Sequence, residues 1–136
     1  MDCIFCKIIK GEIPSFKIYE DDKVIAFLDI NPISPGHTLV VPKKHSETFL
    51  DSDDQTLISL TLTIKKVAQA VVAGLNVEGC NISISNGRAA GQDVFHLHAH
   101  IIPRNENDSL PGWPHGEYLS GEADLLAESI RKQMQA

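Results

Sequence analysis

Seven residues near position 100 restrict this chain more than any other segment. His96, His98 and His100 alternate with apolar residues, and the run closes on Pro103. Because successive side chains of a β-strand point to opposite faces, a strand over residues 96–102 puts the three imidazoles on one face and the intervening apolar residues in a core. Imidazoles titrate near neutral pH, so such a row suits metal binding, anion binding or nucleophilic catalysis.

The overall composition limits the classes of protein to which the chain can belong. Its 136 residues suit a single domain over residues 1–136, and its formal net charge of −6 argues against a polymeric nucleic acid partner on electrostatic grounds. We expect no membrane span, because no uninterrupted apolar run approaches the required length, and the N-terminus resembles no signal peptide. Three cysteines, an odd number, argue against a disulfide framework and favour a cytoplasmic location.

The periodicity of apolar residues predicts an α+β fold with an antiparallel sheet of about five strands. A capping-box pattern, Ser52 followed by Gln55, starts one long amphipathic helix whose apolar residues recur as far as Leu75. Shorter helices are predicted over residues 4–10 and 122–134. Strands are predicted at residues 17–20, 24–28, 37–41, 80–85 and in the histidine run.

The histidine run resembles the signature of the histidine-triad (HIT) family of nucleotide hydrolases and transferases, and it matches that pattern at every position. The resemblance is to the Hint-like branch, because Ile101-Ile102 exclude the Pro-Gln that closes the transferase triad. It implies the same α+β fold, with the sheet extended across a homodimer. Further segments that resemble the family occur in the right order between residues 3 and 104, at residues 4–9, 12–14, 26–30, 36–45, 85–87 and 91–95.

The resemblance also implies a mechanism, in which His98 attacks the α-phosphorus of a nucleotide and forms a covalent nucleotidyl-histidine. The main-chain carbonyl of His96 would fix the tautomer of His98. The residues implied in phosphate binding are His37, Asn86, Gln92, Asp93, Val94 and His100. Asn86-Gly87 can equally be an ordinary turn. Asp93 stands where this branch usually has Ser or Thr, so the preference for a leaving group is open.

A purine nucleoside pocket follows from the same resemblance. Its members by resemblance are Phe5, Ile8, Ile13, Phe27, Ile30 and Leu39, residues that composition alone would assign to an ordinary core. Asp29 follows an apolar strand, where its carboxylate can accept both ribose hydroxyls. An Asp before a turn is also common for local reasons.

Cys3 and Cys6 form a Cys-x-x-Cys pair near the N-terminus. Two thiolates at this spacing fit one tetrahedral Zn²⁺ if two more ligands are present. His45 and His96 are the candidates, and related proteins with this cysteine pair are similar, which predicts a structural Zn²⁺ site. Idle thiols at the chain end are the plain alternative. A rival site would use His96, His98 and His100 to hold a catalytic zinc with a bound water.

Two functions from different classes remain at this point. The first is a purine nucleotide hydrolase, either a nucleoside phosphoramidase or a related nucleotidyl hydrolase, that releases AMP or GMP. The second is a non-catalytic purine-nucleotide sensor or a zinc-stabilised interaction protein. His98 favours the enzyme, because a binding protein has little need of a nucleophile.

Overall fold

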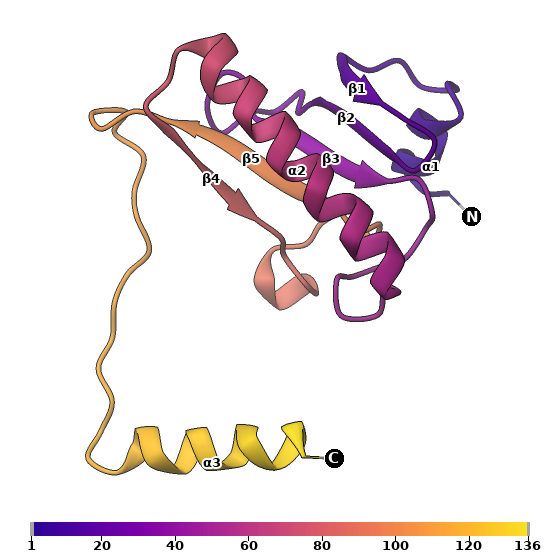
Figure 1. The fold of residues 1–136 in the computed structure, drawn as a ribbon. Helices are drawn as coiled ribbons and strands as arrows, with labels where there is room; N and C mark the ends of the chain where they lie inside the picture. The colour runs from indigo at the N-terminus through magenta and orange to yellow at the C-terminus, as the bar shows by residue number, and fades with distance from the viewer. Residues whose placement is uncertain (1, 136) are drawn as a thin grey trace.

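A computed structural model describes residues 2–135 and contains one five-stranded sheet with a long helix across one face (Figure 1). The strand order is β1-β2-β3-β5-β4, and every neighbouring pair is antiparallel, which confirms the α+β prediction. The strands are β1 (Lys17–Glu20), β2 (Val24–Leu28), β3 (Thr38–Pro42), β4 (Gly79–Ser83) and β5 (Ala99–Arg104). The helices are α1 (Ile4–Ile9), α2 (Asp54–Leu75), α3 (Glu122–Met134) and the 3₁₀ turn η1 (Arg88–Ala90).

The long helix α2 starts one residue later than the capping-box pattern predicted. Asp53 is its N-cap, and the carboxylate accepts the N–H of Thr56 at 2.8 Å. The Ser52 hydroxyl instead donates to the carbonyl of Thr48 in the preceding loop. At the other end Asn76 takes the left-handed conformation, with φ of 53°, and its N–H caps the last turn.

One apolar stripe of α2 covers the sheet and builds the larger core. Leu60 and Val67 are almost fully buried there, against Leu97 and Ile101 from the histidine run. By length and composition alone α2 could cross a membrane, although polar residues interrupt its apolar sequence. Its buried stripe marks it as the core helix of this fold.

The opposite face of the sheet carries a second, smaller core. Phe5 of α1 packs edge-on against Phe27 of β2, with ring centroids 5.6 Å apart. Leu39 and Val41 of β3 complete the cluster. The sheet is therefore covered by α2 on one face and by α1 on the other, and the polar site develops on the α1 side.

The strand predicted to contain the three histidines begins three residues later, at Ala99 rather than His96, so only His100 of the three lies in β5. Its pairing with β3 ends at the Val40–Ala99 pair. The N–H of Leu97 instead donates to the carbonyl of Ser46 in the loop after β3, at 2.8 Å. The alternation survives this change, because Leu97 is 1% exposed in the core under α2.

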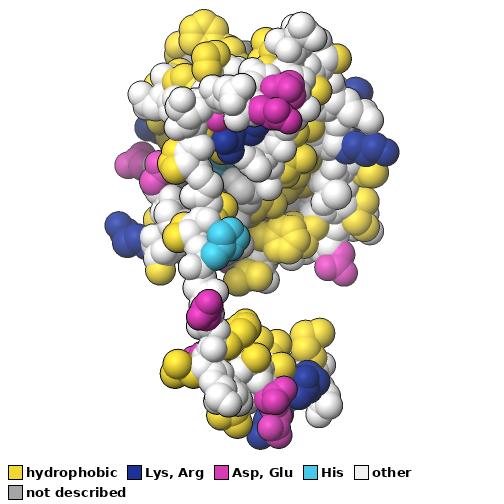
Figure 2. Space-filling view, turned by 90° about the vertical axis from the view of Figure 1, so that its left-hand side faces the viewer, with side chains coloured by type: hydrophobic (Ala, Val, Ile, Leu, Met, Phe, Trp, Pro, Cys, Tyr) yellow, Lys and Arg dark blue, Asp and Glu magenta, His cyan; other side chains and the backbone are white. Residues whose placement is uncertain are grey.

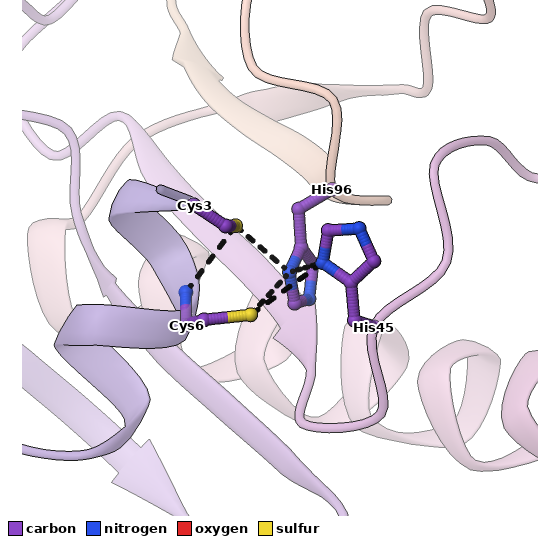
Figure 3. Close-up of side chains that lie close together, drawn as sticks. All are labelled: Cys3, Cys6, His45 and His96. Atoms are coloured by element: carbon purple, nitrogen blue, oxygen red, sulfur yellow. Dashed lines mark hydrogen bonds between the residues drawn. The ribbon is translucent and has the colours of Figure 1, made fainter. Parts of the chain in front are cut away.

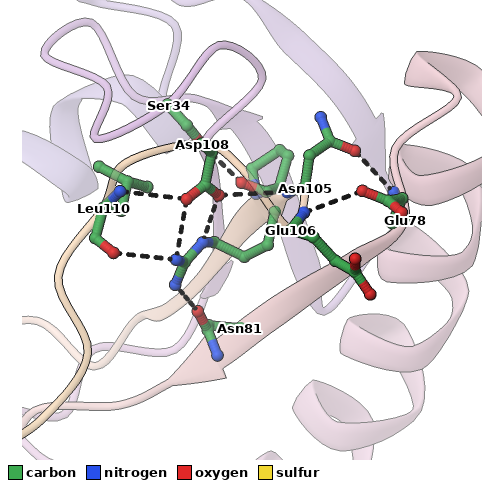
Figure 4. Close-up of polar contacts among 9 residues, drawn as sticks. Ser34, Glu78, Asn81, Asn105, Glu106, Asp108 and Leu110 are labelled. Atoms are coloured by element: carbon green, nitrogen blue, oxygen red, sulfur yellow. Dashed lines mark hydrogen bonds and ion pairs between the residues drawn. The ribbon is translucent and has the colours of Figure 1, made fainter.

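After β5 the chain leaves the body as an extended arm that ends in α3 (Figures 1 and 2). Arg104 anchors the start of the arm, because its guanidinium donates to Asp108, to the side chain of Asn81 and to the carbonyl of Leu110 (Figure 4). Helix α3 matches the predicted range of 122–134, and none of its described residues is buried.

Candidate functional site

Four potential metal ligands meet where α1 approaches the histidine run (Figure 3). The Nδ1 atom of His96 lies 3.4 Å from the sulfur of Cys3 and 3.6 Å from that of Cys6. The Nδ1 atom of His45 lies 3.1 Å from that of His96 and 3.5 Å from the sulfur of Cys6. All four donor atoms lie within 4.8 Å of one another, so this cluster could hold one metal ion.

The hydrogen bonding of His96 leaves its Nδ1 atom free to bind a metal. Its Nε2–H donates to the carbonyl of Pro42 at 2.7 Å, and the ring is fully buried. Nδ1 is therefore the unprotonated nitrogen, and it is the atom that faces the two cysteines. The donor set of two sulfurs and two imidazole nitrogens is that of closed structural zinc sites.

His98 has the opposite arrangement. Its Nδ1–H donates to the main-chain carbonyl of His96 at 2.7 Å, so Nε2 carries the free lone pair. The ring is 5% exposed, and the edge-on ring of Phe5 lies 5.0 Å away between centroids. The predicted bond to the His96 carbonyl is present, and it leaves Nε2 unprotonated, the state that a nucleophilic histidine requires.

A relay of two hydrogen bonds, from Ile33 through His37, sets the tautomer of His100. The Nδ1 atom of His37 accepts the N–H of Ile33 at 3.1 Å, so the proton of His37 is on Nε2. That Nε2–H donates to Nδ1 of His100 at 2.9 Å. His100 therefore carries its own proton on Nε2, as a hydrogen-bond donor beside His98.

Both imidazoles of this relay are held in the neutral form. Burial is the main cause that lowers the pKa of His100 to about 4, and the neighbouring His98 and His37 add to it. Burial also lowers the pKa of His37 below its usual value, although the Asp29 carboxylate opposes that shift. The tautomers assigned from the hydrogen bonds therefore persist at neutral pH.

A cavity of about 260 Å³ lies in front of His98 and His100. All seven residues predicted for the nucleoside line it, and so do Asp93 and Val94. The same wall contains residues that sequence reasoning missed: Ile4, Pro14, Ser15, Leu28 and Asn31. Each of them is next or second in sequence to a residue that was predicted, so closer attention to the flanking positions would have found them.

Three residues predicted to bind phosphate do not line the cavity: His37, Asn86 and Gln92. His37 is 2% exposed and contacts His100 instead. Asn86 accepts the N–H of Phe49, and the buried Gln92 donates to the carbonyls of Glu47 and Val94. Their side chains form hydrogen bonds that hold the loops around the site. Sequence spacing alone cannot distinguish this structural role from contact with a ligand.

A larger hollow of about 550 Å³ lies at the N-terminal end of α2, and none of the histidines lines it. Three lysines line it, and two of them are already paired, Lys43 with Glu20 at 2.7 Å and Lys44 with Asp53. The smaller cavity therefore has the stronger chemical basis as the functional site.

Comparisons with known proteins agree with this geometry. The family model described as the HIT domain matches residues 10–107. The Adenylylsulfatase HINT3 of Arabidopsis thaliana is 39% identical over 139 residues, which cover 98% of this chain and 70% of that protein. A crystal structure of a HIT family member from Bacillus subtilis superposes with a TM-score of 0.89 at 40% identity, over 97% of this chain and 96% of that one.

One of the solved relatives is zinc-bound. This histidine-triad protein from Mycobacterium smegmatis is 35% identical and superposes with a TM-score of 0.78, over 100% of this chain and 99% of that one. The family model covers well over half of the sequence, and the solved relatives share the complete fold. The chain described here therefore belongs to the HIT family.

Proposed function

We propose that this protein hydrolyses purine nucleotides at a phosphoramidate or phosphoanhydride bond, through a covalent intermediate on His98. The observation that carries the proposal is the bond from Nδ1–H of His98 to the carbonyl of His96, which leaves Nε2 unprotonated at the cavity. In the first step Nε2 attacks the α-phosphorus and the leaving group departs. Water then attacks the same phosphorus, the P–N bond to His98 breaks, and AMP or GMP is released.

The walls of the cavity support a purine nucleoside as the bound part of the substrate. Phe5 and Phe27 offer flat apolar surface with few polar groups, which suits stacking without close reading of a base edge. Asp29 lines the cavity, and its Oδ1 accepts the N–H of Asn31, so the turn role is present and the second carboxylate oxygen is left for a ligand. We assign its remaining acceptor capacity to the ribose hydroxyls, and the Nε2–H of His100 to a phosphoryl oxygen.

We further propose that Cys3, Cys6, His45 and His96 hold a structural Zn²⁺. When bound, the ion would cross-link the N-terminal helix to the loop after β3 and to the histidine run, and it would supply no open coordination position for chemistry. The catalytic-zinc alternative has less support, because Nδ1 of His98 and Nε2 of His96 are both occupied by carbonyl oxygens. The free thiols of these cysteines agree with the reducing cytoplasm that we propose as its location.

The homodimer implied by the family resemblance remains a proposal. The outermost strand β4 supports it, because its residues are half-buried or exposed and it pairs with β5 on one side only. An open edge of this kind can extend a sheet into a second copy.

The decisive experiment compares the parent with His98→Asn, a variant that keeps a polar planar group but removes the nucleophile. We expect the parent to release AMP from an adenosine phosphoramidate and to show a transient increase in mass of one adenylyl group. His98→Asn should lose several orders of magnitude in kcat while its affinity for AMP remains. Turnover by the variant within tenfold of the parent would contradict covalent catalysis. Binding without turnover in the parent would establish the sensor alternative.

A further inference from the structure

A second cavity of about 400 Å³ adjoins the functional site. Ile4, Asp93 and Val94 line both cavities, so the two spaces share a wall. The second space is otherwise lined by Asp2, Cys3, His45, Glu47 and Phe95. With the nucleoside held by the apolar residues and Asp29, as proposed above, the departing group would lie toward Asp93 and the wall that the two cavities share.

The two cavities are unusual for a protein that binds phosphates, because no Lys or Arg of the described chain lines either of them. Carboxylates are present instead. Asp93 and Glu47 are exposed, and within residues 2–135 their side chains form no hydrogen bond or ion pair. Asp2 is partly compensated by Lys7 at 3.8 Å, and Arg88 stacks on the ring of Phe95, at 5.8 Å from its centroid, without reaching the wall.

The donor that faces a phosphoryl oxygen is also uncharged. His100 is neutral, so its Nε2–H offers a hydrogen bond and no cation. A substrate with one phosphoryl charge can bind to such a donor. A second anionic group beyond the phosphorus would meet two unpaired carboxylates with no counter-charge, and like charges at close range cost binding energy.

We propose that the carboxylates of Asp93 and Glu47 determine the charge that the leaving group can carry, so that a neutral or cationic leaving group is favoured over an anionic one. This inference rests on the proposed function and adds a charge preference at the leaving group to it. In the selected reaction Nε2 of His98 forms a bond to phosphorus and the P–N bond to the amine breaks. The electron pair stays on the amine nitrogen, which takes one proton from water, and a second water later releases AMP.

The test uses three adenosine phosphoramidates with leaving amines of equal length and different charge. Their amines are 1,2-diaminoethane, propylamine and β-alanine, which place a cation, a methyl group and a carboxylate at the same distance from phosphorus. We expect kcat/KM to decrease in that order, with the cationic and anionic substrates about tenfold apart at low salt. The kcat/KM for adenylyl sulfate should be close to that of the anionic phosphoramidate. Addition of 0.5 M salt should reduce the differences in kcat/KM among the substrates.

Matched variants assign the effect to its residues. The double variant Asp93→Asn/Glu47→Gln should reduce the ratio of kcat/KM for the cationic substrate to that for the anionic substrate to about threefold or less. The change should come chiefly from faster reaction of the anionic substrate. Asp124→Asn removes an equally exposed carboxylate from α3, away from both cavities, and should leave the ratio unchanged. An anionic substrate that reacts as fast as the cationic one, or a ratio that survives the double substitution, would overturn the proposal.

The failure of the proposed function gives a different result, because none of the three substrates would then yield AMP. Charge selection would still be measurable by calorimetric titration of the intact substrates into His98→Asn. The same order of affinities would support the role of Asp93 and Glu47 without turnover. Equal affinities would refute it.

Discussion

His37 offers the sharpest test of the hydrogen-bond relay. Its ring is 2% exposed and has two partners, the N–H of Ile33 at 3.1 Å and Nδ1 of His100 at 2.9 Å. His37→Leu fills most of the volume but removes both hydrogen bonds, and since Ile33 is exposed and His100 only half-buried, each bond is worth about 0.5–1.5 kcal/mol. We therefore expect the free energy of unfolding to fall by about 1–3 kcal/mol. His37→Gln carries an acceptor and a donor on one planar group and should recover at least half of that loss.

Urea denaturation of the three proteins measures the stability difference, and two-bond ¹⁵N–¹H NMR spectra show which nitrogen of His100 carries the proton. In the parent and in His37→Gln that nitrogen should be Nε2, whereas His37→Leu should show a mixture of the two tautomers. Equal losses of stability in Leu and Gln variants would refute the relay. A parent spectrum with the proton on Nδ1 of His100 would refute it as well, whatever the stability.

Three further predictions follow from the same site. Protein purified without chelator should contain one zinc per chain by elemental analysis, and Cys6→Ser should lose the metal and some stability while His98 keeps its chemistry; a zinc-free parent with reduced thiols would count against the cluster. Because the pKa of His100 is lowered from 6.5 to about 4, the unfolded state binds more protons, so stability should decrease as pH falls through that window, by at most about 3 kcal/mol from this residue. The urea midpoint of His100→Asn should depend less on pH there than that of the parent. Asp29→Asn should weaken AMP binding and narrow the preference for AMP over dAMP, and equal affinity of the parent for both in calorimetry would remove Asp29 from the ribose site.

Most of the fold could be predicted because its signals are local. Two short strand-like runs on either side of the turn at Asp21-Asp22 located β1 and β2 over their full lengths, and the final helix matched residue for residue. The differences lie at the ends of elements. Asp53 and Ser52 are both good N-cap residues, and only the loop contacts of Ser52 with Thr48 decide between them.

The site was predictable in its membership and less so in the roles of its members. Apolar residues with a family match identified the cavity wall, and the cysteine spacing with two histidines identified the four side chains that could hold a metal. The roles of His37 and Gln92 could not be predicted, because a buried polar side chain that fastens a loop looks the same in sequence as one that contacts a ligand. Only the partners of each nitrogen and oxygen separate the two cases.

The alternation in the histidine run has a consequence for how this segment can change over evolutionary time. Leu97, Ala99 and Ile101 fill the core under α2, while His98 and His100 face the cavity. An insertion or deletion of one residue here would exchange the two sets, and it would place imidazoles under α2 and apolar groups at the site. Point substitutions can alter catalysis or stability separately, but a change of length in this segment must damage both together.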